Sequence, residues 1–150
     1  GSMAGQWDGL GRLFSEDYLP APKIFYCPAH RGEHRYVDAA SSWLGGTVEI
    51  VGNYQYRACG PRRIASQSGP QLPTTTLLAQ VDPRAAIVTD SLRTKADFSH
   101  QVGANILRAS QSVEWYPDSG RVIVGLLPKD ALQPVEIGPF LQVWSQLDHP

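Results

Sequence analysis

Four side chains in the first half of the sequence are of the types that bind zinc. Cys27 is followed by His30 and His34 in the segment CPAHRGEH, and Cys59 supplies a second sulfur. Thiolate sulfur and imidazole nitrogen are preferred ligands of tetrahedral zinc. A zinc motif normally contains a second close ligand pair, however, and no other cysteine or histidine lies near Cys59. The spacing therefore favours the interpretation that these four residues do not bind a zinc ion.

The two cysteines allow one internal disulfide, Cys27–Cys59. Such a bond would close a loop of about 30 residues and stabilise the fold by roughly 3–4 kcal/mol in the chain-entropy model. Two buried thiols in a reducing compartment are the alternative. The cysteine count alone leaves both states open.

A hydrolytic triad can be assembled from His100, Asp90 and either Ser91 or Ser110. No Gly-x-Ser-x-Gly elbow surrounds either serine, and no papain-type context surrounds a cysteine. No glycine-rich phosphate loop is present either. The sequence therefore predicts no enzyme activity and no cofactor.

Several aromatic side chains could form a flat surface for stacking on sugars. Two of them share the apolar face of one predicted strand, and another aligns with an apolar neighbour two residues earlier. We therefore expect these rings to pack in the core. They are Trp43, Tyr54, Tyr56, Trp115 and Tyr116.

Length and composition are those of one globular domain. The chain has 150 residues, of which 42% are hydrophobic and 18% charged, and its net charge is −1. This near-neutral balance argues against nucleic acid as a partner, because phosphate binding requires a concentrated basic surface. No apolar run reaches the roughly 18 residues of a membrane span. Residues 1–3, Gly-Ser-Met, are typical of an expression vector, so we expect a single domain over residues 4–150.

Patterns in the first half predict one helix and one strand. Apolar residues recur at helical spacing over residues 8–19, with Asp8 as the N-cap and Pro20 as the stop signal. Residues 47–58 alternate between apolar and polar, which predicts a half-exposed antiparallel strand that bends at Gly52. Residues 60–76 are rich in turn formers and predict a surface loop.

The second half predicts most of the sheet. Residues 85–90 form a buried strand, and residues 104–108, 112–116 and 121–126 form a three-stranded meander. Residues 137–147 place apolar side chains at the i, i+3, i+4, i+7 spacing of an amphipathic helix. The predicted fold is α+β, with an antiparallel sheet of about four to five strands and flanking helices.

Three segments together resemble one protein family. The stretch SHQVGANILRASQSVEWY, residues 99–116, resembles the C-terminal signature of prepilin-type proteins, relatives of type II secretion pseudopilins. Residues 13–30 resemble the family's Pro-Lys-x-Phe-x-Cys-Pro segment after a helix, and residues 85–92 resemble its strand that ends in aspartate. Ser110-Gln111 stands where the family has Asp-Gly, which predicts a different hairpin turn. The signature residues that match are Ser99, His100, Gly103, Asn105, Ile106, Leu107, Ser112, Val113 and Trp115.

The resemblance implies a pilin-like head domain without enzyme activity. It implies a preceding hydrophobic helix that anchors the protein in the cytoplasmic membrane, an extracytoplasmic location, and like subunits of a fibre or secretion assembly as partners. It favours the Cys27–Cys59 disulfide, because such a location is oxidising. It also implies structural roles for the signature residues His100, Gly103, Asn105, Ser112 and Trp115. Related pseudopilins bind calcium, but Asp90 and Asp97 are too few for such a site.

Two alternative functions stay open at this point, of which the less favoured is a zinc or serine hydrolase with a pocket where His100 or His30 meets a nucleophile or metal. A carbohydrate- or protein-binding extracytoplasmic domain could share the fold without polymerising. It would require an exposed aromatic patch, whereas an assembly subunit would require the apolar N-terminal helix.

Overall fold

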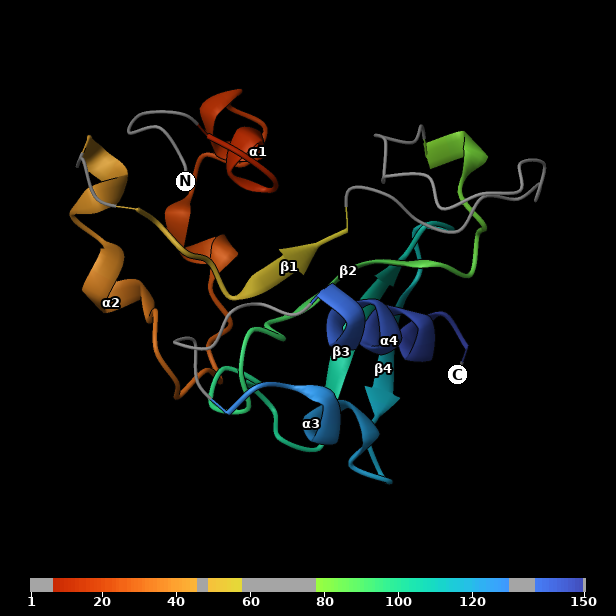
Figure 1. The fold of residues 1–150 in the computed structure, drawn as a ribbon. Coiled ribbons are helices and arrows are strands. Elements are labelled where there is room, and N and C mark those ends of the chain that lie inside the picture. The colour runs from red at the N-terminus through yellow and green to blue at the C-terminus, as the bar shows by residue number, and fades with distance from the viewer. Residues whose placement is uncertain (1–6, 46–48, 58–77, 130–136, 150) are drawn as a thin grey trace.

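The computed structural model describes residues 7–45, 49–57, 78–129 and 137–149. Its elements form an α+β fold around one antiparallel sheet (Figure 1). In chain order they are α1 (Gly11–Ser15), η1 (Pro22–Phe25), α2 (Tyr36–Ala39), η2 (Ser42–Leu44), β1 (Tyr54–Tyr56), η3 (Leu78–Gln80), β2 (Ala86–Asp90), β3 (Gly103–Arg108), β4 (Val113–Pro117), α3 (Val122–Leu126) and α4 (Ile137–Asp148).

The sheet has four strands in the order β1-β2-β3-β4, and every neighbouring pair is antiparallel. The strands predicted over residues 85–90, 104–108 and 112–116 are confirmed as β2, β3 and β4 to within one residue. The register shifts between Ala86 and Val88, so β2 carries one extra residue opposite β3. A fifth strand is absent from the described ranges of the chain.

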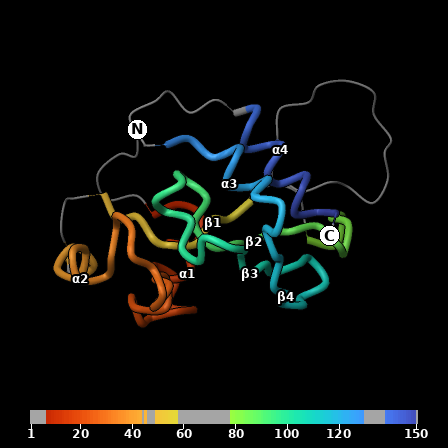
Figure 2. Tube along the Cα trace, turned by 90° about the horizontal axis from the view of Figure 1, so that it is seen from below, coloured from red at the N-terminus to blue at the C-terminus, as the bar shows by residue number. Residues whose placement is uncertain are grey.

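Helices α3 and α4 lie together on one face of the sheet, as Figures 1 and 2 show. The helix predicted over residues 137–147 is confirmed as α4. Side chains from β2, β3, α3 and α4 form the main core between the two layers. The fully or nearly fully buried members include Phe98, Ile106, Ile123, Val143 and Leu147.

The strand predicted over residues 121–126 is wrong, because this segment is the helix α3. The Asp118 carboxylate accepts hydrogen bonds from the backbone N–H groups of Ile123 and Val124, each at 3.1 Å. It thereby satisfies N–H groups that lack a partner at a helix start. A short apolar run such as residues 122–126 cannot be assigned to helix or strand by periodicity alone. The meander consists of β2, β3 and β4 instead.

Two arginine side chains, Arg57 and Arg108, bind the end of α4 to the sheet. The Arg57 guanidinium donates to both carboxylate oxygens of Asp148, at 2.9 and 2.8 Å. The same carboxylate accepts the backbone N–H of Ala86 in β2 at 2.9 Å. Arg108 donates to the backbone carbonyl of Leu147 at 2.9 Å and to the Glu114 carboxylate at 2.9 Å. The position of α4 is therefore set by charge pairing as well as by apolar packing.

The N-terminal segments form a second, aromatic cluster beside the β1 edge of the sheet (Figure 1). Trp43 lies at its centre, with ring centroids 5.1 Å from Phe25 and 4.7 Å from Phe14. The helix predicted over residues 8–19 is shorter than expected, since α1 covers only Gly11–Ser15. Asp8 contributes its backbone carbonyl, which accepts the Gly11 N–H at 2.8 Å, instead of a side-chain cap.

Two backbone hydrogen bonds mark where strands begin and end. Of the strand predicted over residues 47–58, the described part, residues 49–57, contains only β1; just before it, the Asn53 N–H donates to the Phe25 carbonyl of the N-terminal segment at 2.9 Å. Between β3 and β4, Gln111 adopts a φ of 70° and its N–H donates to the Arg108 carbonyl. This is a three-residue hairpin loop that ends in a left-handed residue, which differs from the two-residue Asp-Gly turn as expected.

No helix in the described ranges is long and apolar enough to cross a membrane. The surface loop predicted over residues 60–76 and Cys59 both lie outside those ranges.

Candidate functional site

Two polar clusters form where the loop of residues 27–34 packs against the connection between β2 and β3. The loop follows η1, and the His30 N–H closes a turn on the Cys27 carbonyl at 3.1 Å. The connection, residues 91–102, carries His100 just before β3. Both clusters therefore combine side chains that lie far apart in the sequence.

The first cluster, which we name the His100 cluster, consists of Cys27, Asp90, His100 and Asn105. The Nε2 atom of His100 lies 3.7 Å from the Cys27 sulfur, 3.4 Å from Asp90 Oδ2 and 3.4 Å from Asn105 Nδ2. The ring of Trp115 in β4 meets the imidazole edge to face, with centroids 5.4 Å apart. Asp90 comes from the end of β2 and Asn105 from β3, so the antiparallel register brings them together.

Asp90 is the buried acid of this cluster, with 1% of its surface exposed. Its Oδ2 atom accepts the backbone N–H of Asn105 at 2.6 Å and the Asn105 side-chain amide at 3.1 Å. Its Oδ1 atom is buried and has no hydrogen-bond partner. Such an unpaired carboxylate oxygen is costly in a protein interior.

Tyr54 in β1 lies opposite Asp90 in the sheet register. Burial raises the pKa of the Tyr54 phenol above its usual 10.0, and the negative charges of Cys27 and Asp90 raise that pKa further. The raised pKa thus indicates negative charge near the phenol.

The second cluster surrounds His30, whose side chain is 1% exposed. His30 Nδ1 lies 3.0 Å from the Ser99 hydroxyl, and Nε2 contacts the Glu33 backbone carbonyl. The Nε2 atom also lies 3.7 Å from Oδ1 of Asp97, a buried acid whose carboxylate has no hydrogen-bond partner. The imidazole of His30 is therefore a close polar neighbour of the buried Asp97 carboxylate.

The structure does not bring the sequence-based zinc set to one point in the described part of the chain. Cys27 faces His100, whereas His30 faces Asp97. His34 Nε2 lies 3.0 Å from the Arg93 guanidinium, which occupies the nitrogen that a metal would need. Cys59 lies outside the described residues, so the Cys27–Cys59 disulfide stays a prediction.

The signature residues divide into two places. His100 and Asn105 belong to the His100 cluster, and Gly103 lies beneath the Trp115 ring. A Cβ atom on Gly103 would lie 2.3 Å from the Tyr116 carbonyl oxygen and 2.5 Å from the Trp115 ring. Ser112 lies at the far end of the hairpin, where its hydroxyl contacts Ser110 at 3.0 Å.

The expectation of core packing for the aromatic residues is wrong for two of them. Tyr56 and Trp115 are each 47% exposed, on the sheet face opposite α3 and α4. Trp43 is buried, as expected, and Tyr116 packs against the main core. Sequence alternation placed these residues on one sheet face but did not determine that α3 and α4 cover the other face.

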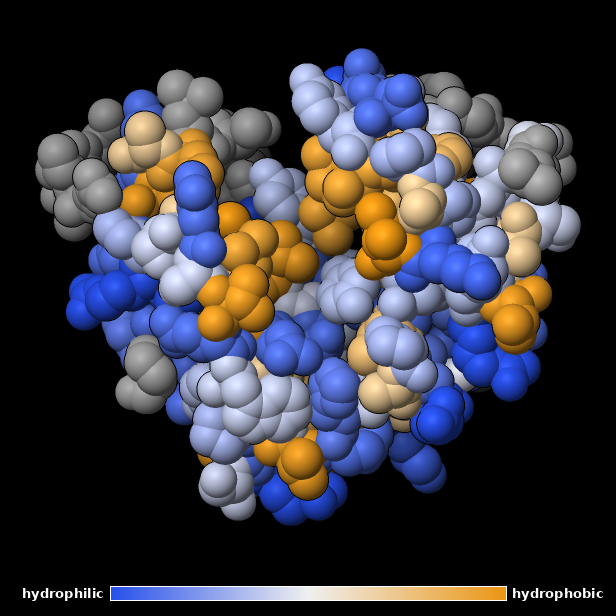
Figure 3. Space-filling model, turned by 180° about the vertical axis from the view of Figure 1, so that it is seen from behind, coloured by the Kyte–Doolittle hydropathy of each residue, from blue (hydrophilic) through white to orange (hydrophobic). Residues whose placement is uncertain are grey.

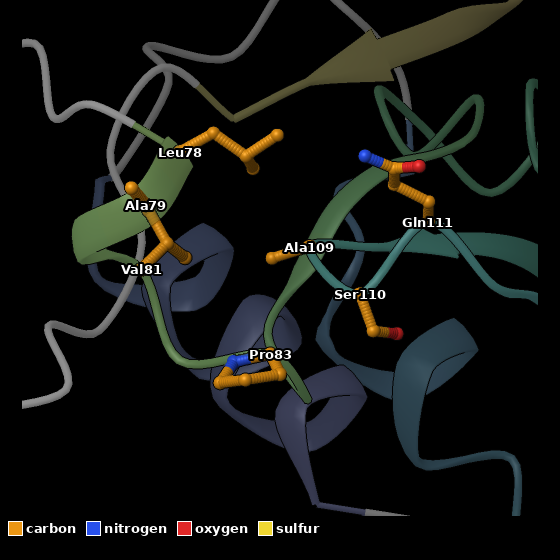
Figure 4. Close-up of a pocket in the computed structure, with 7 residues that line it drawn as sticks. All are labelled: Leu78, Ala79, Val81, Pro83, Ala109, Ser110 and Gln111. Atoms are coloured by element: carbon orange, nitrogen blue, oxygen red, sulfur yellow. The ribbon is translucent and has the colours of Figure 1, made fainter.

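A shallow pocket of about 300 Å³ lies at the opposite end of β3. Figure 4 shows that its walls come from η3, the turn before β2 and the β3–β4 hairpin. Among the described residues that line it, none is acidic, basic or a histidine, so the pocket places no general base beside the Ser110 hydroxyl. Its lining residues are Leu78, Ala79, Val81, Pro83, Ala109, Ser110 and Gln111.

His100 and Asp90 are two members of the triad that the sequence analysis rejected, and the sulfur-bearing side chain beside them is Cys27. The sequence patterns paired Cys27 with His30, His34 and Cys59, and none of them paired it with His100. Cys27 is separated from His100 by 73 residues, and no local spacing rule reaches that far. Their positions in segments that resemble one family were the only sequence signal that linked them.

No protein-family model, curated protein or solved structure matches this chain. The function must therefore be argued from the site and from the sequence motifs.

Proposed function

We propose that this chain is the globular head of a pilin-like subunit in a type II secretion or type IV pilus-like assembly, anchored outside the cytoplasm and without enzyme activity. The observation that carries the proposal is the His100 cluster. Its members come from all three segments that resemble prepilin-type proteins.

The first of these segments is distant in sequence from the other two, and all three touch in space. Cys27 comes from residues 13–30, Asp90 from residues 85–92, and His100 with Asn105 from residues 99–116. The second and third segments contain the paired strands β2 and β3, so the informative contact is that of Cys27 with His100, 73 residues away. The convergence supports reading the segments as parts of one structural signature.

The exposed face of the sheet supports a role in assembly. Val113 is 70% exposed there, next to the half-exposed Trp115 and Tyr56. Helices α3 and α4 cover only the opposite face (Figure 2). Figure 3 shows hydrophobic side chains gathered in separate patches on this side of the molecule. Exposed apolar patches of this kind are typical of surfaces that contact other proteins.

The first test asks whether the native protein is anchored in the cytoplasmic membrane. The full-length native protein should fractionate with the cytoplasmic membrane, and its mature N-terminus should begin just after a prepilin-peptidase site. Recovery of the native protein in a soluble fraction, or removal of a secretory signal peptide, would refute the proposal.

The second test is contact between like subunits. A photo-reactive amino acid at Val113 in the full-length protein should cross-link it to other copies in cells. Val37 in α2 is a matched control, because it is 72% exposed but lies away from this sheet face. Equal cross-linking yields at both positions would argue against the sheet face as an assembly surface.

The exposed rings of Tyr56 and Trp115 favour a second candidate, an extracytoplasmic carbohydrate- or protein-binding domain that does not polymerise. Flat aromatic rings at about half exposure can stack on sugars. On this alternative, Tyr56→Ala should abolish retention on a glycan array while the thermal unfolding midpoint stays near that of the wild type. If no glycan on the array retains the wild-type protein, the carbohydrate-binding alternative is refuted.

A further inference from the structure

We propose that Cys27, Asp90 and His100 form a binding site for a zinc-class divalent metal ion. One ligand atom from each of the three side chains lies within 4.8 Å of the other two. This set differs from the zinc set read from local spacing, with which it shares only Cys27. The inference does not depend on the proposed assembly role.

Hydrogen bonding alone does not explain the contacts of His100. Its Nε2 atom lies 3.4 Å from both Asp90 Oδ2 and Asn105 Nδ2, longer than the roughly 2.7–3.2 Å of ordinary hydrogen bonds, and 3.7 Å from the Cys27 sulfur. A protonated Nε2 can donate to Asp90, but the Asn105 amide N–H then faces another donor. An unprotonated Nε2 can accept from Cys27 and Asn105, but the Asp90 carboxylate then faces its lone pair. Each protonation state leaves one contact unfavourable.

The same distances fit atoms that share a metal ion. Around tetrahedral zinc, with about 2.3 Å to sulfur and about 2.0 Å to nitrogen or oxygen, neighbouring ligand atoms lie about 3.3–3.6 Å apart. The structure has 3.7 Å between the Cys27 sulfur and His100 Nε2, and 3.4 Å between His100 Nε2 and Asp90 Oδ2. These two separations therefore match those around a shared ion, and the sulfur and the Asp90 carboxylate lie within 4.8 Å of each other.

The buried Asp90 carboxylate supplies an independent observation. Its Oδ1 atom has no hydrogen-bond partner although the residue is 1% exposed. Asn105 donates to Oδ2 through both its backbone and side-chain N–H groups, which fixes the orientation of the carboxylate. Metal-binding carboxylates commonly have such an outer partner.

A cysteine–histidine–aspartate catalytic relay is a weaker explanation of the same residues. A relay requires the nucleophile and the acid to contact different nitrogens of the imidazole ring. Here Cys27 and Asp90 both lie nearest to Nε2. Convergence on one nitrogen is the arrangement expected around an ion.

Ligand chemistry and access determine the kind of ion. A thiolate and an imidazole favour zinc-class metals over calcium and magnesium, which prefer all-oxygen sites. The His100 side chain is 23% exposed, so the site has a route to solvent. With three protein ligands, a tetrahedral ion keeps one position for water or another ligand.

A second group, Glu33, His34 and Asp97, also lies within ligand distance. The Arg93 guanidinium lies 3.0 Å from His34 Nε2, however, and its positive charge opposes a cation there. We therefore assign the ion to the His100 cluster alone.

The proposed metal site requires Cys27 to be a free thiolate, because only a thiolate binds the metal. A Cys27–Cys59 disulfide and a metal at this site exclude each other. The redox state of Cys27 thus separates this inference from the disulfide that the family resemblance favours.

The experiment is cobalt titration of metal-free protein that was purified without a reductant. We expect one equivalent of Co²⁺ to give a near-ultraviolet thiolate-to-cobalt band, and one equivalent of Zn²⁺ to displace it. Cys27→Ser should remove the band, and His100→Gln should weaken Co²⁺ binding. Asn105→Ala should lower the affinity about tenfold, as loss of an outer partner commonly does. His34→Gln and Cys59→Ser are the matched controls and should bind as the wild type does.

Three results would overturn the inference. One is a wild-type protein without the cobalt band, and another is a band that survives in Cys27→Ser. The third is mass-spectrometric detection of a disulfide at Cys27 in the protein as purified. His100→Gln keeps the test valid if Cys27→Ser fails to fold, because His100 is partly exposed and its loss disturbs the core less.

Discussion

Replacement of Gly103 by alanine should destabilise the fold severely. Gly103 is the first residue of β3 and pairs with Pro117 of β4. An added Cβ would lie 2.3 Å from the Tyr116 carbonyl oxygen and 2.5 Å from the Trp115 ring. Real Cβ contacts below 3.0 Å are essentially never seen, and a backbone oxygen cannot rotate away as a side chain can.

The expected loss in free energy of unfolding follows from the overlap of the added Cβ with Tyr116 and Trp115. Overpacking by one methyl group usually costs about 1–3 kcal/mol, and an overlap with backbone belongs at the upper end, about 3 kcal/mol. For a domain of this size, each kcal/mol lowers the unfolding midpoint by about 2–4 °C, so we expect a fall of about 6–12 °C. Calorimetry and urea unfolding of the purified domain would measure both quantities.

Gly125 provides the matched control, because a Cβ there would meet no atom within 4 Å. It is exposed in the helix α3, where alanine is favoured over glycine by about 0.8–1.0 kcal/mol. Gly125→Ala should therefore raise the midpoint slightly while Gly103→Ala lowers it. If both variants unfold at the wild-type temperature, or Gly103→Ala is the more stable, the packing of Trp115 over β3 is wrong.

Two further predictions concern charge and pH. Asp148→Asn should lower the free energy of unfolding, measured in urea, by about 2 kcal/mol, because Arg57 loses a largely buried partner. The control is Asp38→Asn, in an exposed pair, which should change the free energy of unfolding by about 0.5 kcal/mol or less in the same experiment. Burial raises the pKa of Tyr26 above its usual 10.0, so the folded state binds this proton more tightly than the unfolded state. Stability from Tyr26 should be complete below pH 10.0 and lost as the pH rises through its folded pKa. Urea unfolding across alkaline pH measures that loss, and an equal loss in Tyr26→Phe would contradict it.

Local sequence patterns predicted most of the main sheet. Residues 86–90, 103–108 and 113–117 follow the predicted strands, and α4 follows the predicted amphipathic helix. These elements have clear periodicity because one side faces the core. The pattern failed for residues 122–126, where the choice between helix and strand depended on the Asp118 carboxylate and on packing against α4.

The candidate site shows a different division. The sequence alone identified Cys27, Asp90 and His100 as residues able to do chemistry, since their side-chain types are sufficient for that. Only the tertiary structure decided that the three meet at one imidazole nitrogen while His30 and His34 face other partners. The physical reason is that side-chain type is a local property. Proximity depends on the register of β2 with β3 and on the packing of a loop 73 residues away in sequence.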